Sequence, residues 1–153
     1  MSYEVQVKHV DSVPIAGIAG RARRGNMSQV IRKLFDEFYK DPPPGVPRGL
    51  NIVYYEYPGE ASANAEGIPL CCGVQLSAPC APHGNIQCLA TPAGEAATVT
   101  HWGDYSELGK AYDALKEWSK QTGRKFASPF WEVYGHHNDD PAKRQTDVYR
   151  LLA

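Results

Sequence analysis

Residues 95–118, EAATVTHWGDYSELGKAYDALKEW, hold the pattern that decides the fold. The part that ends at Trp102 predicts a strand, and Gly103 then breaks the chain because glycine tolerates a tight turn. Beyond it, apolar residues recur every three or four positions, which places them on one face of a helix: Tyr105, Leu108, Tyr112, Leu115 and Trp118. Asp104 or Ser106 is expected to cap this helix, and Gly123 to end it.

The same order of elements occurs earlier in the chain. An extended segment over 13–23 is followed by a break at Gly25 and Asn26, and then by a second helical pattern: Met27, Val30, Ile31, Leu34, Phe35 and Phe38. The prolines from Pro42 stop this helix, since proline has no amide donor. Period-two alternation and bounding turn residues predict the remaining strands: 3–10, 51–57, 68–77, 86–89, 129–134 and 145–152.

A shift of about 78 positions lays one half of the chain over the other, with Gly25 on Gly103 and Met27 on Tyr105. Identity between the halves is almost absent, so the repeat is one of pattern. We therefore predict an α+β fold of two β-α-β-β units related by a pseudo-two-fold axis. Its sheet is mixed and mostly antiparallel, carries two helices, and has a ligand groove between the halves. The chain 1–153 is expected to be one domain, with halves of about 1–80 and about 84–153.

Composition excludes several classes of protein. The 153 residues are 42% apolar and 22% charged, with a net charge of −1, so bulk electrostatics favour no direct nucleic-acid partner. No apolar run reaches the roughly 20 residues of a membrane span, and the N-terminus lacks the profile of a secretory signal. The sequence thus predicts a cytoplasmic protein with no membrane partner. Its four cysteines are expected to be free thiols: Cys71, Cys72, Cys80 and Cys88.

The most informative candidate is Glu132, in the strand FWEVY. Alternation places Phe130, Glu132 and Tyr134 on one face and Trp131 on the other. A carboxylate between two aromatic rings indicates a ligand pocket, in which the rings stack and the acid supplies charge. The alternatives are that Glu132 faces solvent or pairs with an internal arginine such as Arg150. Spacing alone does not decide between them.

Other polar residues have weaker support. His101 could act as a general base, although a lone histidine is more often structural. The pair His136 and His137 lies in a loop and lacks a third ligand at fixed spacing, so no metal site is predicted. No phosphate loop, hydrolase elbow or CxxC pattern is present, and no cofactor is expected.

Several motifs together resemble the GyrI-like small-molecule-binding family, also called the AraC-type effector-binding domain. In the second half they are Pro92-Ala93-Gly94 leading to His101, Gly103 and Tyr105, then Ala111-Tyr112, Leu115 and Trp118, then Glu132 and Tyr134, and finally Thr146-Asp147-Val148-Tyr149. The first half matches more loosely, through the strands IVYYEYPG and IPLCCGVQL. The closing strand and the proline-rich linker APCAPHG depart from the family pattern.

The resemblance implies a tandem pair of β-α-β-β units around a groove that binds hydrophobic, often cationic compounds, with Glu132 contacting the ligand. Many members are fused to DNA-binding helices, whereas this domain begins almost at Met1 and is expected to stand alone. The candidate ligand-binding residues are Glu132, Tyr134, Trp131, Trp102, Tyr55 and Tyr112. Two alternatives stay open. One is hydrolysis of reactive cyclopropane-type toxins by Glu132, and the other is a protein-interaction role, such as gyrase inhibition or a homodimer.

Overall fold

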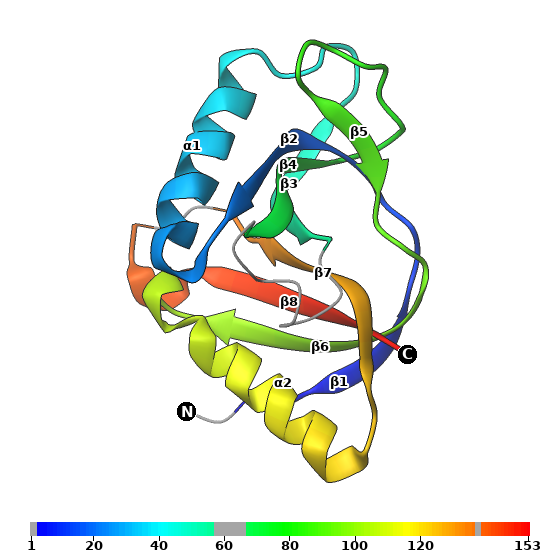
Figure 1. Ribbon diagram of the computed structural model, residues 1–153, viewed down its shortest axis with the longest axis vertical. Coiled ribbons are helices and arrows are strands. Elements are labelled where there is room, and N and C mark those ends of the chain that lie inside the picture. Colours follow the sequence, from blue (N-terminus) through cyan, green and yellow to red (C-terminus); the bar gives the residue numbers. More distant parts are fainter. Residues whose placement is uncertain (1–2, 57–66, 137–138) are drawn as a thin grey trace.

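A computed structural model of the protein describes residues 3–56, 67–136 and 139–153 (Figure 1). Eight strands within these ranges form one sheet in the order β1-β6-β8-β7-β3-β4-β2-β5. Neighbouring strands in this sheet pair antiparallel. Helix α1 packs on β2 and β4, and helix α2 packs on β6. The predicted α+β class with two helices is confirmed.

The elements follow the order that the sequence predicts, with boundaries that differ by a few residues. Those of the first half are β1 (Gln6–Val10), β2 (Pro14–Ala22), η1 (Arg24–Asn26), α1 (Met27–Lys40), β3 (Arg48–Tyr55) and β4 (Ile68–Leu76). Those of the second half are β5 (Gln87–Ala90), β6 (Gly94–Trp102), η3 (Tyr105–Glu107), α2 (Gly109–Thr122), β7 (Phe126–Tyr134), η4 (Pro141–Lys143) and β8 (Gln145–Leu152).

The strand order is symmetric about the β7–β3 pair, which forms the seam between the two β-α-β-β units. The leading strands are exchanged, because β1 pairs with β6 of the second unit and β5 pairs with β2 of the first. The sequence did not predict this exchange. No single shift relates the halves: β2 and β6 begin 80 positions apart, at Pro14 and Gly94, whereas α1 and α2 begin 82 apart, at Met27 and Gly109.

The helix ends show which local signals were correct. The Asp104 side chain accepts a hydrogen bond from the Ser106 backbone N–H, so Asp104 is the cap, but it caps the short helix η3. The helix α2 begins only at Gly109 and ends at Thr122. Its C-cap is Gly123, whose φ of 75° is the left-handed conformation that favours glycine. Of the helices in the described ranges, none is long and apolar enough to cross a membrane.

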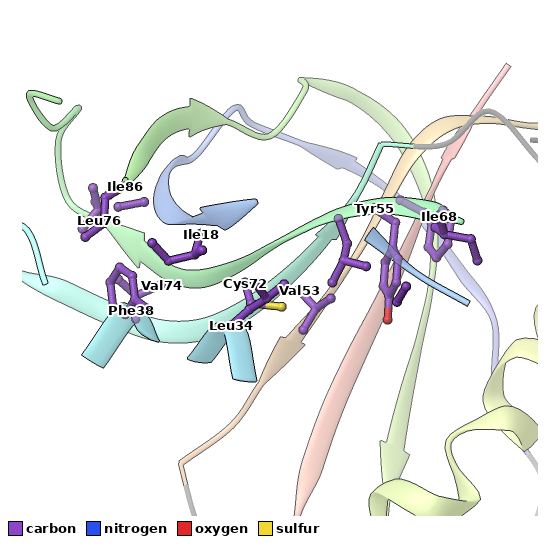
Figure 2. Packing of buried hydrophobic residues seen from close by; sticks show 14 residues of the cluster. Ile18, Leu34, Phe38, Val53, Tyr55, Ile68, Cys72, Val74, Leu76 and Ile86 are labelled. Carbon is purple, nitrogen blue, oxygen red and sulfur yellow. The ribbon is translucent and has the colours of Figure 1, made fainter. Parts of the chain in front are cut away.

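The core lies on both faces of the sheet, because alternate residues of the central strands are buried on each side. On the helix-bearing face, Leu34 and Phe38 of α1 lie against Cys72 and Val74 of β4 (Figure 2). The opposite face buries a second cluster that includes Trp131. Strands that are buried on both sides fix the register of the sheet, since a slip of one residue would exchange the two faces.

The cysteines behave differently from the prediction in one respect. Cys71 and Cys72 are buried free thiols on β4, as expected, and burial raises the pKa of Cys71 to about 12. Cys80 and Cys88, however, form a disulfide. The chain turns back between them through a bridge that pairs His83 with Ile86, and this brings their Cα atoms to 5.7 Å. The expectation of four free thiols was therefore wrong, because it weighed composition and overlooked a local hairpin.

Gly73 of β4 is expected to be essential for the packing of the sheet. A Cβ at this position would lie 1.7 Å from the backbone oxygen of Ala16 and 2.5 Å from the Cα of Gly17. Because both are backbone atoms of the neighbouring strand β2, Gly73→Ala should lower the free energy of unfolding by about 3 kcal/mol. Urea denaturation measures this. Gly25→Ala is the control, since nothing lies within 4 Å of its Cβ position; equal stability of the two variants would contradict the prediction.

Candidate functional site

Glu132 lies in the middle of the sheet, on the seam strand β7. Alternation turns its side chain toward the helices, and only 3% of the residue is exposed. Its cross-strand neighbours are Val53 on β3 and Val148 on β8. The carboxylate therefore lies between two valines in an apolar part of the sheet. Such a position is costly for a charge unless other groups compensate it.

Three tyrosine hydroxyls provide that compensation. Tyr55 of β3 and Tyr134 of β7 donate to Oε1 of Glu132, at O–O distances of 3.4 Å and 2.5 Å. Tyr112 of α2 donates to Oε2. A carboxylate only accepts hydrogen bonds and a phenol can donate one, so the chemistry of the four groups matches. The tyrosines come from both halves of the chain, which means that the cluster forms only when the halves meet.

Burial dominates the electrostatics of this cluster. It raises the pKa of Glu132 above the ordinary value of 4.5, and the hydrogen bonds from the tyrosines oppose that rise. Burial and the negative charge of Glu132 raise the pKa of Tyr112 and Tyr134 well above 10. The phenols consequently remain protonated near neutral pH and continue to donate. The cluster is thus an acid that has lost its water and accepts hydrogen bonds from neutral donors in place of it.

The carboxylate forms part of the floor of a cleft of about 1150 Å³ between the two helices. Tyr55 and Tyr134 complete that floor. The wall from α1 is mostly apolar, with Met27, Ile31, Phe35 and Tyr39; the opposite wall has Tyr105 of η3 with Leu108 and Tyr112. A large, mainly apolar cleft with a few convergent polar groups is the usual form of a small-molecule site.

Aromatic rings pack against one another in two groups beside the acid. Tyr55 stacks on Phe130 with ring centroids 4.6 Å apart, and Tyr112 meets the same ring edge-on at 6.0 Å. Tyr105 packs edge-on against Tyr134 at 5.5 Å. These contacts restrict the ring rotamers, so the hydroxyls are held on Glu132 before any ligand arrives.

The rim of the cleft carries charges of both signs. Arg32 and Asp36 lie on the α1 side, and Arg144 lies on the other side, with its guanidinium 5.7 Å from the centre of the Tyr105 ring. A mixed rim does not select a ligand by net charge. Selection by charge must therefore come from the buried floor.

Comparison with known proteins identifies the family. A model described as the GyrI-like small molecule binding domain matches residues 3–151. The chain belongs to this family. No curated protein matches it significantly in sequence.

Solved structures share the GyrI-like fold at low identity. The crystal structure of the EcmrR C-terminal domain is 18% identical with a TM-score of 0.80, over 100% of this chain and 99% of that one. In the EcmrR–DNA complex the identity is 20% and the TM-score 0.75, over 98% of this chain but 57% of the longer one. SAV2435, solved with bound tetraphenylphosphonium, is 11% identical with a TM-score of 0.73, over 98% and 94% of the two chains.

A further match is described as a hydrolase from Listeria innocua. It is 9% identical to this chain with a TM-score of 0.62, over 98% of this chain and 92% of that one. At these identities the matches establish the fold alone.

The GyrI-like domain brings together four of the six residues that the sequence singled out. Tyr55, Tyr112, Glu132 and Tyr134 line one cleft. Trp131 and Trp102 do not line it, so neither is retained as a candidate.

Both tryptophans are excluded by the alternation of their strands. Trp131 is 4% exposed on the opposite face of the sheet and stacks on Tyr149 at 5.6 Å. Trp102 points outward at the end of β6 and is 48% exposed. Neither ring can reach the cleft while Glu132 faces it.

His101 is buried, and its hydrogen bonds hold local structure together. Its Nδ1 lies 2.9 Å from the Tyr3 hydroxyl, and its Nε2 lies 2.9 Å from the backbone oxygen of Asp104. With both ring nitrogens hydrogen-bonded and no place in the lining of the cleft, His101 has no geometry for the general-base role. Within the described ranges, no three His, Cys, Asp or Glu side chains form a group that could hold a metal. His137 lies outside those ranges.

Sequence reasoning missed part of the cleft. Tyr39 and Asn51 line it, although neither was a candidate. Alternation from Tyr55 through Val53 places Asn51 on the same face, so a signal for it existed. Tyr105 was assigned to the core face of the helix, but in the structure it is 43% exposed at the cleft.

Glu132→Gln should make stability less dependent on pH. Because the pKa of Glu132 is raised on folding, the folded protein binds this proton more tightly than the unfolded chain. The free energy of unfolding therefore falls as pH rises from 4.5 through the raised pKa. Removing the charge should raise the free energy of unfolding at about pH 7 and change it little at about pH 4. Urea denaturation at these two pH values measures the difference.

The exposed Glu117, on α2, provides the control. Glu117→Gln should change stability by similar, small amounts at the two pH values. A Glu132→Gln variant whose stability relative to the native protein is the same at both pH values would contradict the electrostatic account of the site.

Proposed function

We propose that this GyrI-like domain captures hydrophobic, cationic or polar aromatic small molecules in the cleft, with Glu132 as the charged contact. The observation that carries the proposal is the cluster at the floor. Glu132 is buried, and its hydrogen-bond partners among the described residues are three neutral phenols. A buried carboxylate without a cationic partner retains much of its desolvation penalty, and a bound cation would offset it.

The walls suit the same ligands. A cation beside an aromatic face gains roughly 0.5–2 kcal/mol, and rings surround the acid on several sides. Apolar residues such as Ile31 and Leu108 add area for a ligand's hydrocarbon groups. The tetraphenylphosphonium bound to SAV2435, a lipophilic cation on the same fold, supports the choice of ligand class.

Tetraphenylphosphonium is the probe for this proposal. It has no titratable group and donates no hydrogen bond, so charge and ring contacts govern its binding. Glu132→Gln should weaken binding about tenfold or more, a change of about 1.4 kcal/mol, in isothermal titration calorimetry. The substitution keeps the shape of the side chain.

Glu117→Gln removes an equal charge from an exposed position of α2 and is the matched control. Its affinity should stay within about twofold of the native value. Equal affinity of Glu132→Gln and the native protein, with both folded by circular dichroism, would disprove the role of the acid.

A hydrolase is the second candidate, and the raised pKa of Glu132 favours it. An acid whose pKa is shifted toward neutrality is suited to proton transfer. In this alternative Glu132 accepts a proton from water as the water oxygen bonds to a carbon of a strained cyclopropane. The ring C–C bond breaks, its electron pair moves to the conjugated acceptor group of the substrate, and that group takes up the proton.

The hydrolase alternative predicts turnover that depends on Glu132. Incubation with a cyclopropane-type electrophile should give a product heavier by one water, followed by mass spectrometry. Glu132→Gln should slow this at least about 100-fold, as expected for the loss of a general base. Binding of the electrophile without formation of that product would leave capture as the function.

The remaining sequence expectations stay proposals. A protein-interaction role would use a surface away from the cleft and would be insensitive to Glu132→Gln. A cytoplasmic location is opposed by one feature, the disulfide between Cys80 and Cys88, because disulfides are rare in reducing compartments.

A further inference from the structure

A second polar group lies on the α1 side of the cleft, apart from the Glu132 cluster. The Tyr39 hydroxyl donates a hydrogen bond to Oδ1 of Asn51. Both residues line the cleft. Tyr39 comes from the last turns of α1, and Asn51 comes from β3, so the contact spans the side of the cleft opposite to α2.

The register of the sheet fixes how Asn51 relates to Glu132. Asn51 pairs with Tyr134 across the seam, and Val53 pairs with Glu132. Asn51 and Glu132 are therefore diagonal neighbours on the same face of two antiparallel strands, which separates them by roughly 7–8 Å. This separation suits two functional groups of one small molecule.

The hydrogen bond from Tyr39 also fixes what Asn51 can offer. Because the amide oxygen accepts from the Tyr39 hydroxyl, the amide is held with its oxygen toward Tyr39, and both N–H donors on Nδ2 remain available. The structure gives this nitrogen no partner among the described residues, and the side chain is half-buried at the cleft. One end of the cleft thus presents an acceptor, the Glu132 carboxylate, and the other end presents donors.

We propose that Asn51 is a second anchoring point for the ligand and selects elongated cations that carry a hydrogen-bond acceptor, such as a carbonyl, ester or amide oxygen. The cationic group contacts Glu132, the hydrocarbon part lies between the aromatic walls, and the acceptor receives an N–H of Asn51. Tyr39 orients the amide. This inference rests on the proposed capture function and narrows its ligand class.

The test compares two probes that share one cation. One is an alkyltriphenylphosphonium, and the other is its counterpart of equal chain length whose chain carries an ester carbonyl. Asn51→Leu keeps the approximate volume of the side chain and removes both donors. It should weaken binding of the ester probe about fivefold, which corresponds to one hydrogen bond, and change binding of the alkyl probe less than about twofold.

Tyr39→Phe separates anchoring from a purely structural contact. It breaks the same Tyr39–Asn51 hydrogen bond but leaves the N–H donors in place. If Asn51 only fastens β3 to α1, both substitutions should weaken both probes alike, and this result would overturn the proposal. In our account, Tyr39→Phe lowers the preference for the ester probe less than Asn51→Leu does, because the N–H donors remain although the Tyr39 hydroxyl no longer orients them.

Glu132→Gln distinguishes this inference from the function on which it rests. It should weaken both probes by a similar factor, since both carry the cation. If Glu132→Gln weakens both probes while Asn51→Leu changes the two affinities by the same factor, Asn51 is not an anchor and the capture function stands. If the native protein binds neither probe, or if Glu132→Gln changes neither affinity, the capture function fails and the inference fails with it.

Discussion

The hydrogen bonds of three tyrosines to the buried Glu132 are the interaction on which the rest of the site depends. Tyr55 belongs to the first β-α-β-β unit, whereas Tyr112, Glu132 and Tyr134 belong to the second. The Tyr55 hydroxyl therefore reaches the acid only when β3 and β7 pair in the observed register. A slip of one residue would turn Glu132 to the face that buries Trp131, away from the three hydroxyls that now donate to it. The pairing of β3 with β7 thus forms the site, and the contacts in the site in turn favour this register.

This arrangement trades stability for readiness to bind. Valines on both sides of Glu132 and rings above it raise the free energy of the ionised acid, which is why its pKa is raised. Neutral phenols reduce this cost without cancelling the charge. A site that used an arginine in their place would be more completely neutralised but would have no charge left for a ligand. Tyrosine is suited to the task because it donates one hydrogen bond and also supplies a stacking surface.

Periodicity carried most of the prediction. Alternation placed Glu132 and Tyr134 on one face, and three- and four-residue steps placed Tyr112 on the inner face of α2. Alternation fixes relative faces only, and it does not say which face borders the groove, so Trp131 was named beside Glu132 although the two cannot share a face. The contact of Tyr39 with Asn51 and the exchange of β1 and β5 were beyond the sequence, because each depends on pairing between segments that no local pattern reports. The Cys80–Cys88 disulfide is local, and it was missed because composition was weighed in place of the turn between the two cysteines.

The pseudo-symmetry of the fold also explains why Glu132 is the single acid that the described residues place on the floor of the cleft. The seam runs between equivalent strands, in which residues 130–134 of β7 pair with residues 51–55 of β3, and Glu132 pairs with Val53. A second carboxylate at Val53 would lie directly opposite the first, at a spacing of roughly 5 Å in a buried sheet. Two like charges so close together cannot both ionise. The two halves must therefore differ at the seam: the second supplies the acid, and the first supplies the Tyr55 hydroxyl and the Asn51 amide that an acid can tolerate as neighbours.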